Sequence, residues 1–252
     1  MAGNPFSLEG KVALVTGGNV GLGQGIAVAL AQAGADIVSV ARRPSDETGE
    51  QVRAAGRRFL SIEADLGSLA PIAGIVADTL KALGGLHVLV NNAGIIRRAD
   101  AVDFSEDDWD AVMDVNLKST FFLTQAVGRH FIAQGHGKVI NVASMLSFQG
   151  GIRVPSYTAS KSGLAGITKL LTNEWAGKGI NVNAIAPGYM DTDNTALLRA
   201  DAARNNAILE RIPAGRWGNP DDLGGAAVFL ASSASDYVNG AILPVDGGWL
   251  AR

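Results

Sequence analysis

The chain has 252 residues, a formal net charge of −3 and no cysteine. This length is enough for a sizeable core, and the lack of cysteine excludes disulfides, thiolate catalysis and cysteine-ligated zinc. The near-balanced charge excludes the basic footprint typical of nucleic-acid binding, and 47% apolar against 18% charged residues excludes a mainly disordered chain.

The histidines and the N-terminal segment lead to further expectations. His87, His130 and His136 are scattered, so we expect no metal site. Residues 1–11 lack a charged segment followed by an apolar run, and no uncharged apolar run reaches about 18 residues. We therefore expect no signal peptide, no transmembrane helix and no membrane partner. Together with the absence of cysteine, this predicts a cytoplasmic protein.

Short β-branched runs alternate with longer segments of helical periodicity along the chain. Ser105, with acidic residues directly after it, is typical of a helix N-cap. In chain order the sequence predicts a strand over 11–16, a helix over 21–33, a strand over 37–41, a helix over 46–55, a strand over 58–62, a helix over 68–83, a strand over 86–91, a broken helix over 105–134, a strand over 138–142, a helix over 156–176, a strand over 180–185, a polar helix over 197–211, a helix over 220–230 and a strand over 241–245.

Continuous apolar strands, each followed by a helix, favour a parallel sheet that is covered on both faces. No Pro/Ser-rich linker, repeat or low-complexity segment divides the chain. We expect one doubly wound α/β domain over residues 1–252, built on a seven-stranded parallel sheet with helices on both faces.

The segment after the first expected strand is rich in glycine and opens a helix, with the sequence TGGNVGLG over residues 16–23. Glycines allow a tight turn here, and the helix N-terminus offers free N–H groups to a pyrophosphate. The spacing G-x3-G-x-G is not specific by itself, and a tight turn with close helix packing remains the alternative.

Two arginines, Arg42 and Arg43, follow the second expected strand. A carboxylate at this place would bind the ribose hydroxyls of NAD, whereas an arginine accepts the 2′-phosphate of NADP. Arg42 therefore favours NADP, and a pair of solvated surface arginines is the alternative.

Tyr157 and Lys161 are four residues apart on an expected helix, so they share one face. Ser144 closes the fifth strand, at the edge where α/β sheets bind ligands. A nearby ammonium group stabilises phenolate and should lower the tyrosine pKa, which would let Tyr157 exchange a proton with a carbonyl or alcohol oxygen.

These motifs, in this order, resemble the classical short-chain dehydrogenase/reductase family. The resemblance covers nearly the whole chain and rests on TGGNVGLG, on NNAG at 91–94, on Asn116, Ser144 and YTASK at 157–161, and on PGYMDT at 187–192. It implies a Rossmann fold and an enzyme that transfers hydride between NADP or NAD and a CH–OH group.

The resemblance also implies roles for individual residues. Tyr157 would be the acid/base, Lys161 would tune it and hold the nicotinamide ribose, Ser144 would orient the substrate carbonyl, and Asn116 would anchor a water in the proton relay. The implied cofactor-binding residues, besides Arg42, Tyr157 and Lys161, are Gly17, Asn19, Gly21, Leu22, Gly23, Asp65, Leu66, Asn92, Ala93, Gly94, Pro187, Gly188 and Thr192.

Five segments, at 144–163, 181–190, 210–218, 232–240 and 245–252, resemble the sugar-acid branch of this family. That branch usually uses NAD, which conflicts with Arg42. An anionic sugar acid needs a cation for its carboxylate, and Arg97, Arg98, Gln149 and Arg153 are the candidate substrate residues. Asp191 and Asp193 would be unfavourable beside such a substrate unless they point away. We expect the polar segment 189–211, and its part 189–204 in particular, to close over the substrate.

Three other functions remain open at this stage. A 3-oxoacyl-carrier-protein reductase would need a basic patch for its acidic carrier, and no clustered Lys/Arg run is visible. A catalytically silent nucleotide-binding regulator would lack one of the three residues Ser144, Tyr157 and Lys161, and a methyltransferase would have no use for YxxxK or NNAG. We also expect a homotetramer, because the helical segments 116–134 and 156–176 are apolar over much of their circumference.

Overall fold

The computed structural model describes residues 4–252; Met1–Gly3, where the expectation about a signal peptide begins, lie outside the described residues. Seven parallel strands form one sheet in the order β3-β2-β1-β4-β5-β6-β7. The strands are β1 (Val12–Thr16), β2 (Asp36–Ala41), β3 (Phe59–Glu63), β4 (Val88–Asn91), β5 (Gly137–Val142), β6 (Ile180–Pro187) and β7 (Ile242–Val245).

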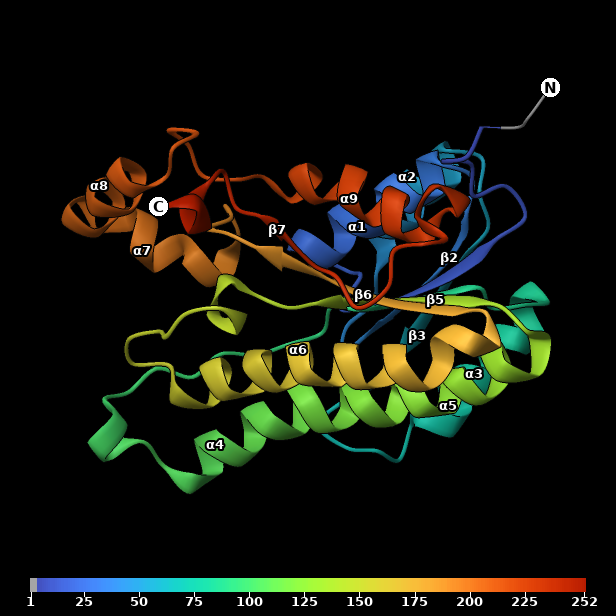
Figure 1. Cartoon of the computed structure of the whole chain (residues 1–252), viewed down its shortest axis with the longest axis horizontal. Helices are drawn as coiled ribbons and strands as arrows, with labels where there is room; N and C mark the ends of the chain where they lie inside the picture. Colours follow the sequence, from blue (N-terminus) through green and yellow to red (C-terminus); the bar gives the residue numbers. More distant parts are fainter. Residues whose placement is uncertain (1–3) are drawn as a thin grey trace.

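Helices cover both faces of this sheet, as Figure 1 shows. The α-helices are α1 (Gly21–Gln32), α2 (Asp46–Ala54), α3 (Ile72–Leu83), α4 (Glu106–Met113), α5 (Ser119–Gln134), α6 (Pro155–Trp175), α7 (Ala196–Ala200), α8 (Ala202–Arg211) and α9 (Gly224–Ala231). The prediction of a doubly wound, seven-stranded parallel sheet is confirmed.

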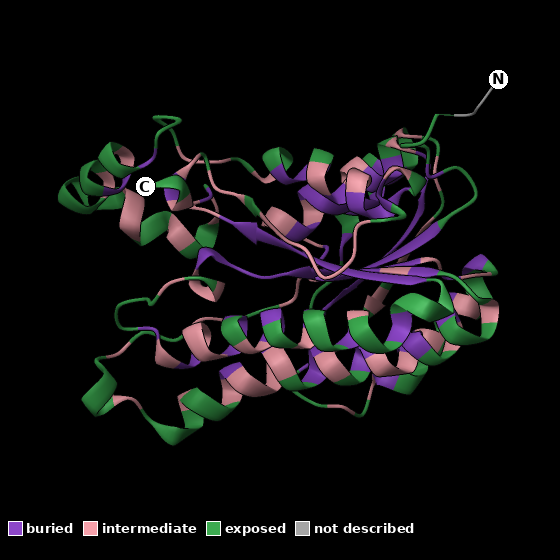
Figure 2. Ribbon diagram, viewed as in Figure 1, coloured by how far each residue is buried: buried purple, intermediate pink, exposed green. Residues whose placement is uncertain are grey.

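Two apolar cores, one on each face, hold the layers together, and the buried residues form bands along both sides of the sheet (Figure 2). On one face Ile26 of α1 and Leu230 of α9 pack against strand residues. On the other face Leu123 of α5 and Leu171 of α6 do the same. Because both faces of these strands are buried, residues pointing to either face are apolar, and the strands appear in the sequence as unbroken β-branched runs.

The order of the strands reverses between β1 and β4, because β2 and β3 lie on one side of β1 and the later strands on the other. Ligands of open α/β sheets bind at such a reversal, beyond the carboxyl ends of the strands. Helices α7 and α8 lie together beyond this edge, beside the C-terminus (Figure 1).

Most element boundaries agree with the predicted ranges, and the differences have local causes. Ser105 is an N-cap, and its Oγ accepts a hydrogen bond from Asp108 N at 3.2 Å. The helix expected from residue 68 begins only after Pro71, and the break expected within 105–134 is a π turn at Asp114–Lys118. The polar helix over 197–211 is two helices, because Asp201 caps a new one. Within the described residues no helix has the length and apolarity needed to cross a membrane.

Candidate active site

A cavity of about 1470 Å³ lies at the carboxyl edge of the sheet. Of the catalytic, cofactor and substrate residues expected from the sequence, all but Gly23 and Asn116 line it. They come from the turns after the strands, from α6 and from the segment before α7. The lining residues are Gly17, Asn19, Gly21, Leu22, Arg42, Asp65, Leu66, Asn92, Ala93, Gly94, Arg97, Arg98, Ser144, Gln149, Arg153, Tyr157, Lys161, Pro187, Gly188, Asp191, Thr192 and Asp193.

The glycine turn between β1 and α1 has a backbone that only glycine adopts easily. Gly17 has φ 63° and Gly21 has φ 56°, in the left-handed region that side chains disfavour. A Cβ at Gly23 would collide with the carbonyl oxygen of Gly17. The N-cap Val20 makes no side-chain hydrogen bond to the helix, so the first-turn amides face the cavity without a cap. This cradle fits a pyrophosphate.

The end of β4 is tied to the same turn by Thr16. Its Oγ1 accepts hydrogen bonds from Asn92 N and Ala93 N, each at 3.0 Å. In return, Asn92 Nδ2 donates to the carbonyl oxygens of Thr16 and Gly17, at 3.0 and 3.1 Å. The NNAG segment is thereby fixed beside the glycine turn, residues 17–23, and lines the cavity where the strand order reverses between β1 and β4.

The end of the cavity beside β2 and β3 is basic. Arg42 and Arg43 follow β2, are exposed and line the cavity. Asp65 follows β3, and its Oδ1 accepts a hydrogen bond from Gly67 N at 2.9 Å, while Leu66 is buried beside it. These residues fit the adenosine half of a nicotinamide cofactor, with a cation where a 2′-phosphate would lie.

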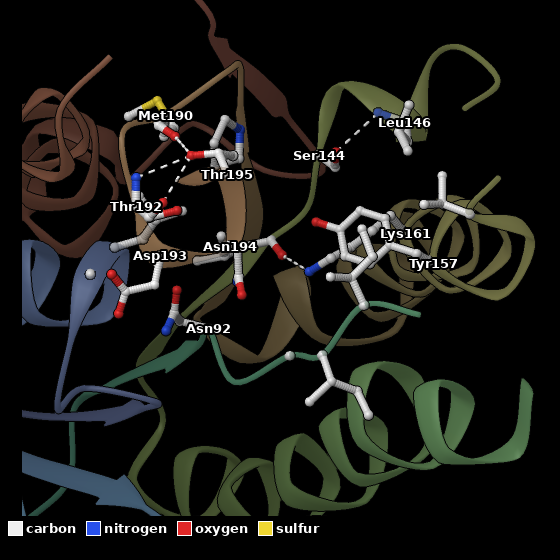
Figure 3. A pocket seen from close by; sticks show the side chains of 18 of the residues that line it. Asn92, Ser144, Leu146, Tyr157, Lys161, Met190, Thr192, Asp193, Asn194 and Thr195 are labelled. Carbon is white, nitrogen blue, oxygen red and sulfur yellow. Dashed lines mark hydrogen bonds between the residues drawn. The ribbon is translucent and has the colours of Figure 1, made fainter. Parts of the chain in front are cut away.

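Tyr157 and Lys161 come from α6, and Ser144 lies two residues after the end of β5. Pro155 starts α6 at the position where the missing N–H costs nothing, and two turns of helix then present both side chains to the cavity. Ser144 and Tyr157 lie on the same side of it (Figure 3). Lys161 Nζ donates to Val142 O at 2.6 Å and lies 5.6 Å from the centre of the Tyr157 ring.

The pKa values of this group differ from the expectation based on sequence. Burial raises the pKa of the Tyr157 phenol, although the Ser144 hydroxyl and the charge of Arg98 act in the opposite direction. Burial lowers the pKa of Lys161 to about 8. The expected lowering of the tyrosine pKa is therefore wrong: burial has the largest effect on the phenol, and the Lys161 ammonium group is hydrogen-bonded to Val142 O.

Asn116 lies behind the cavity wall, in the π turn that separates α4 from α5. It is buried, and its Oδ1 accepts a hydrogen bond from Ile95 N at 2.8 Å while its Nδ2 donates to Ile95 O at 2.9 Å. Its Nδ2 also donates to Ser160 Oγ at 3.3 Å. The residue thus joins the segment after NNAG to α6 at Ser160, directly before Lys161.

The four residues expected at the substrate from the sequence are held by other groups. Arg98 donates to Asn194 O at 3.3 Å. Arg97 pairs with Asp108 and Arg153 pairs with Asp100, each at 3.0 Å, and Gln149 Oε1 accepts from Trp249 Nε1 at 3.4 Å. They line the cavity, but Arg97 and Arg153 already have carboxylate partners. The cavity-lining Arg204 and Arg211 of α8 were missed; their place in the polar segment 189–211 was the available signal.

Of the two aspartates after β6, Asp191 is paired with an arginine and does not offer an unpaired charge to the cavity. Asp191 pairs with Arg199 of α7 at 2.6 Å, and the Arg199 guanidinium also donates to Thr192 O at 3.2 Å. Thr195 closes the turn, since its Oγ1 accepts from Thr192 N and donates to Met190 O (Figure 3). Arg199 therefore offsets the negative charge of Asp191 and ties the Thr192 turn to α7.

Comparison with known proteins places this arrangement in a family. A family model described as enoyl-(acyl carrier protein) reductase matches residues 17–250. A 2-dehydro-3-deoxy-D-gluconate 5-dehydrogenase of Dickeya dadantii is 64% identical over 250 residues, covering 99% of both chains. The chain belongs to the short-chain dehydrogenase/reductase family, and it is a NAD(P)-dependent oxidoreductase.

Two solved structures share the fold over almost the whole chain. A protein of Agrobacterium tumefaciens, described as a 2-deoxy-D-gluconate 3-dehydrogenase with bound NADP, is 63% identical with a TM-score of 0.92, covering 99% of this chain and all of its own. A gluconate 5-dehydrogenase of Burkholderia cenocepacia, in complex with NADP and tartrate, is 42% identical with a TM-score of 0.93, covering 98% of each chain.

Proposed function

We propose that the protein interconverts a hydroxyl and a keto group of a sugar acid related to 2-dehydro-3-deoxygluconate or 2-deoxygluconate, with NADP as the favoured cofactor. The observation that carries the proposal is the arginine-rich cavity around Ser144, Tyr157 and Lys161. The similar proteins named above act on sugar acids by name, and NADP is bound in both similar structures.

The chemistry then follows from the residues of the cavity wall. The cofactor supplies a nicotinamide ring that accepts or donates the hydride. Ser144 donates a hydrogen bond to the reacting substrate oxygen, and the Tyr157 phenol gives that oxygen a proton or takes one from it. Lys161, four residues along α6, stabilises the phenolate form of Tyr157 whenever its ammonium group is charged. Asn116 anchors a water of the proton relay.

We propose that residues 1–252 form a single NAD(P)-binding domain. The cofactor lies at the carboxyl edge of the sheet, where the strand order reverses between β1 and β4. The turn after β1 holds the pyrophosphate, and the segment after β6 holds the nicotinamide end. The residues proposed to bind the cofactor are Gly17, Asn19, Gly21, Leu22, Gly23, Arg42, Asp65, Leu66, Asn92, Ala93, Gly94, Tyr157, Lys161, Pro187, Gly188 and Thr192.

A substrate panel tests the proposed function. The wild-type protein is assayed with NADP and NAD against hydroxylated sugar acids and the matching uncharged polyols, and with NADPH and NADH against a 3-oxoacyl thioester. We expect turnover with the sugar acids, and faster turnover with NADP. Reduction of the thioester with no activity on any sugar acid would instead support a 3-oxoacyl-carrier-protein reductase activity.

Arg42 is expected to set the cofactor preference. In the described residues 4–252 it forms no ion pair, so its charge is available to a 2′-phosphate. Arg42→Ala should lower the ratio of kcat/KM for NADP over NAD by about 10- to 100-fold, the effect of one charged hydrogen bond. Arg43→Ala is the matched comparison; an unchanged ratio in the Arg42 variant would remove Arg42 from the cofactor site.

The assembly proposed is a homotetramer. Helices α5 and α6 lie side by side on one face of the sheet (Figure 1), and Phe122, Ile132 and Leu170 on them are exposed. Such apolar residues on neighbouring helices favour a subunit contact. Light scattering should give about four times the 26.0 kDa mass of one chain, and a monomer at micromolar concentration would contradict this. We also propose that the enzyme is cytoplasmic, because a chain without cysteine fits a reducing compartment.

A further inference from the structure

Helix α8 presents two arginines to the cavity. Arg204, Ala207, Ile208 and Arg211 all line it, and their spacing of three, four and seven residues puts them on one side of a helix. Ile208 is buried in a small apolar cluster with Trp249, so this side of α8 is held over the site. Arg204 and Arg211 are two turns apart, about 10 Å along the helix axis, and both side chains are long enough to reach a ligand between them.

The charges of these two arginines are not balanced by the protein. Within the described part of the chain, neither guanidinium forms an ion pair. By contrast, Arg97, Arg153 and Arg199 at the same end of the cavity each have a carboxylate within 3.0 Å. Among the described residues, Arg98 after the NNAG segment also lines the cavity without an ion pair, and its guanidinium donates to Asn194 O at 3.3 Å. Arg204 and Arg211 are therefore cations at this end of the cavity whose charge is available to a bound anion.

Trp249 holds one of the two in place without neutralising it. The guanidinium carbon of Arg211 lies 3.9 Å from the centre of the Trp249 ring, a cation–π contact that leaves its N–H groups free to donate. The indole N–H of Trp249 donates to Gln149 Oε1 at 3.4 Å. Through Trp249, Arg211 is thus linked to the loop between Ser144 and Tyr157. Arg204 is exposed and lies nearer the N-terminal end of α8.

We propose that Arg204 and Arg211 form the subsite that binds the carboxylate of the substrate, and that this ion pairing holds α8 closed over the reacting atoms. The inference rests on the proposed sugar-acid activity, because an anionic substrate supplies the counter-charge that the protein lacks here. Ser144 and Tyr157 hold the reacting oxygen from β5 and α6, and α8 holds the opposite end of the molecule. A neutral substrate would leave two like charges facing the cavity, so closure would be weaker.

A sugar acid and its primary amide test this subsite, because they share every hydroxyl and differ in charge alone. Both are assayed with saturating NADP for the wild type and for Arg204→Gln and Arg211→Gln. Each variant should lower kcat/KM for the acid by about 10- to 100-fold, as expected for a charged hydrogen bond, and change that for the amide less than about twofold. Arg211→Lys should recover part of the loss, and Kd for NADP should stay constant.

Arg216→Gln is the control, because Arg216 follows the same segment, is exposed and pairs with Asp222 at 2.7 Å; it should leave both substrates unchanged. Equal losses for acid and amide in the α8 variants, or a preserved preference for the acid, would overturn the subsite alone. A wild-type enzyme that does not prefer the acid over the amide would overturn the sugar-acid function, and the subsite with it.

Discussion

Tyr157→Phe is expected to lower kcat by about a thousandfold, because it removes the proton donor and acceptor at the reacting oxygen, and general acid–base catalysis contributes 10²- to 10⁴-fold. The aromatic ring, and with it the packing of α6, stays in place. The loss should therefore appear in kcat, measured under saturating substrate and NADP, with cofactor binding still measurable by titration.

Tyr237→Phe is the matched control for this loss, since Tyr237 is fully exposed on the surface and should have no effect. Turnover near the wild-type rate in the Tyr157 variant would remove the tyrosine from the reaction. A variant that also fails to bind NADP would mean that the hydroxyl serves the cofactor site instead.

Lys161→Met is expected to remove a pH dependence of stability. Burial lowers the pKa of Lys161 from 10.5 to about 8, so between these values the unfolded chain binds more protons than the folded chain. The free energy of unfolding of the wild type, relative to the methionine variant, should therefore rise as the pH increases through this window. The full rise is about 3 kcal/mol, and below the folded pKa the cost of the buried charge is fully present.

Denaturant unfolding at about pH 7 and about pH 10 measures this rise. The difference between wild type and variant cancels groups common to both, including Tyr157, whose raised pKa acts only at high pH. Lys169→Met is the matched control for loss of a lysine side chain, because Lys169 is exposed on the same helix. A pH-independent difference between the wild type and the Lys161 variant would show that the Lys161 ammonium group is not desolvated.

The sheet and its helices could be predicted because their signals are local. Buried parallel strands are continuous apolar runs, and caps such as Ser105 mark helix starts. The elements with shifted boundaries lie where a local signal was weaker: α3 begins after Pro71, and Asp201 divides the polar segment into α7 and α8. The residues around the cradle could also be placed, because the carboxyl ends of parallel strands share one edge.

The substrate end could not be predicted in the same way, because its charges are settled by tertiary contacts. Arg153 lies close to Tyr157 in sequence, yet it pairs with Asp100 from another loop and has φ 62°. Nothing in the sequence around residue 153 shows that partner. The sequence also shows neither the burial of the Tyr157 phenol nor the contact between Lys161 Nζ and Val142 O, so the expected direction of the tyrosine pKa was wrong.

The most direct test of sugar-acid oxidoreduction is to identify the product formed from 2-dehydro-3-deoxy-D-gluconate and NADP by the wild-type protein. We predict that NMR and mass spectrometry will show one hydroxyl converted to a keto group, with the loss of two hydrogens and one NADPH formed for each molecule oxidised. No NADPH from this or any other sugar acid, together with reduction of a 3-oxoacyl thioester, would contradict the account.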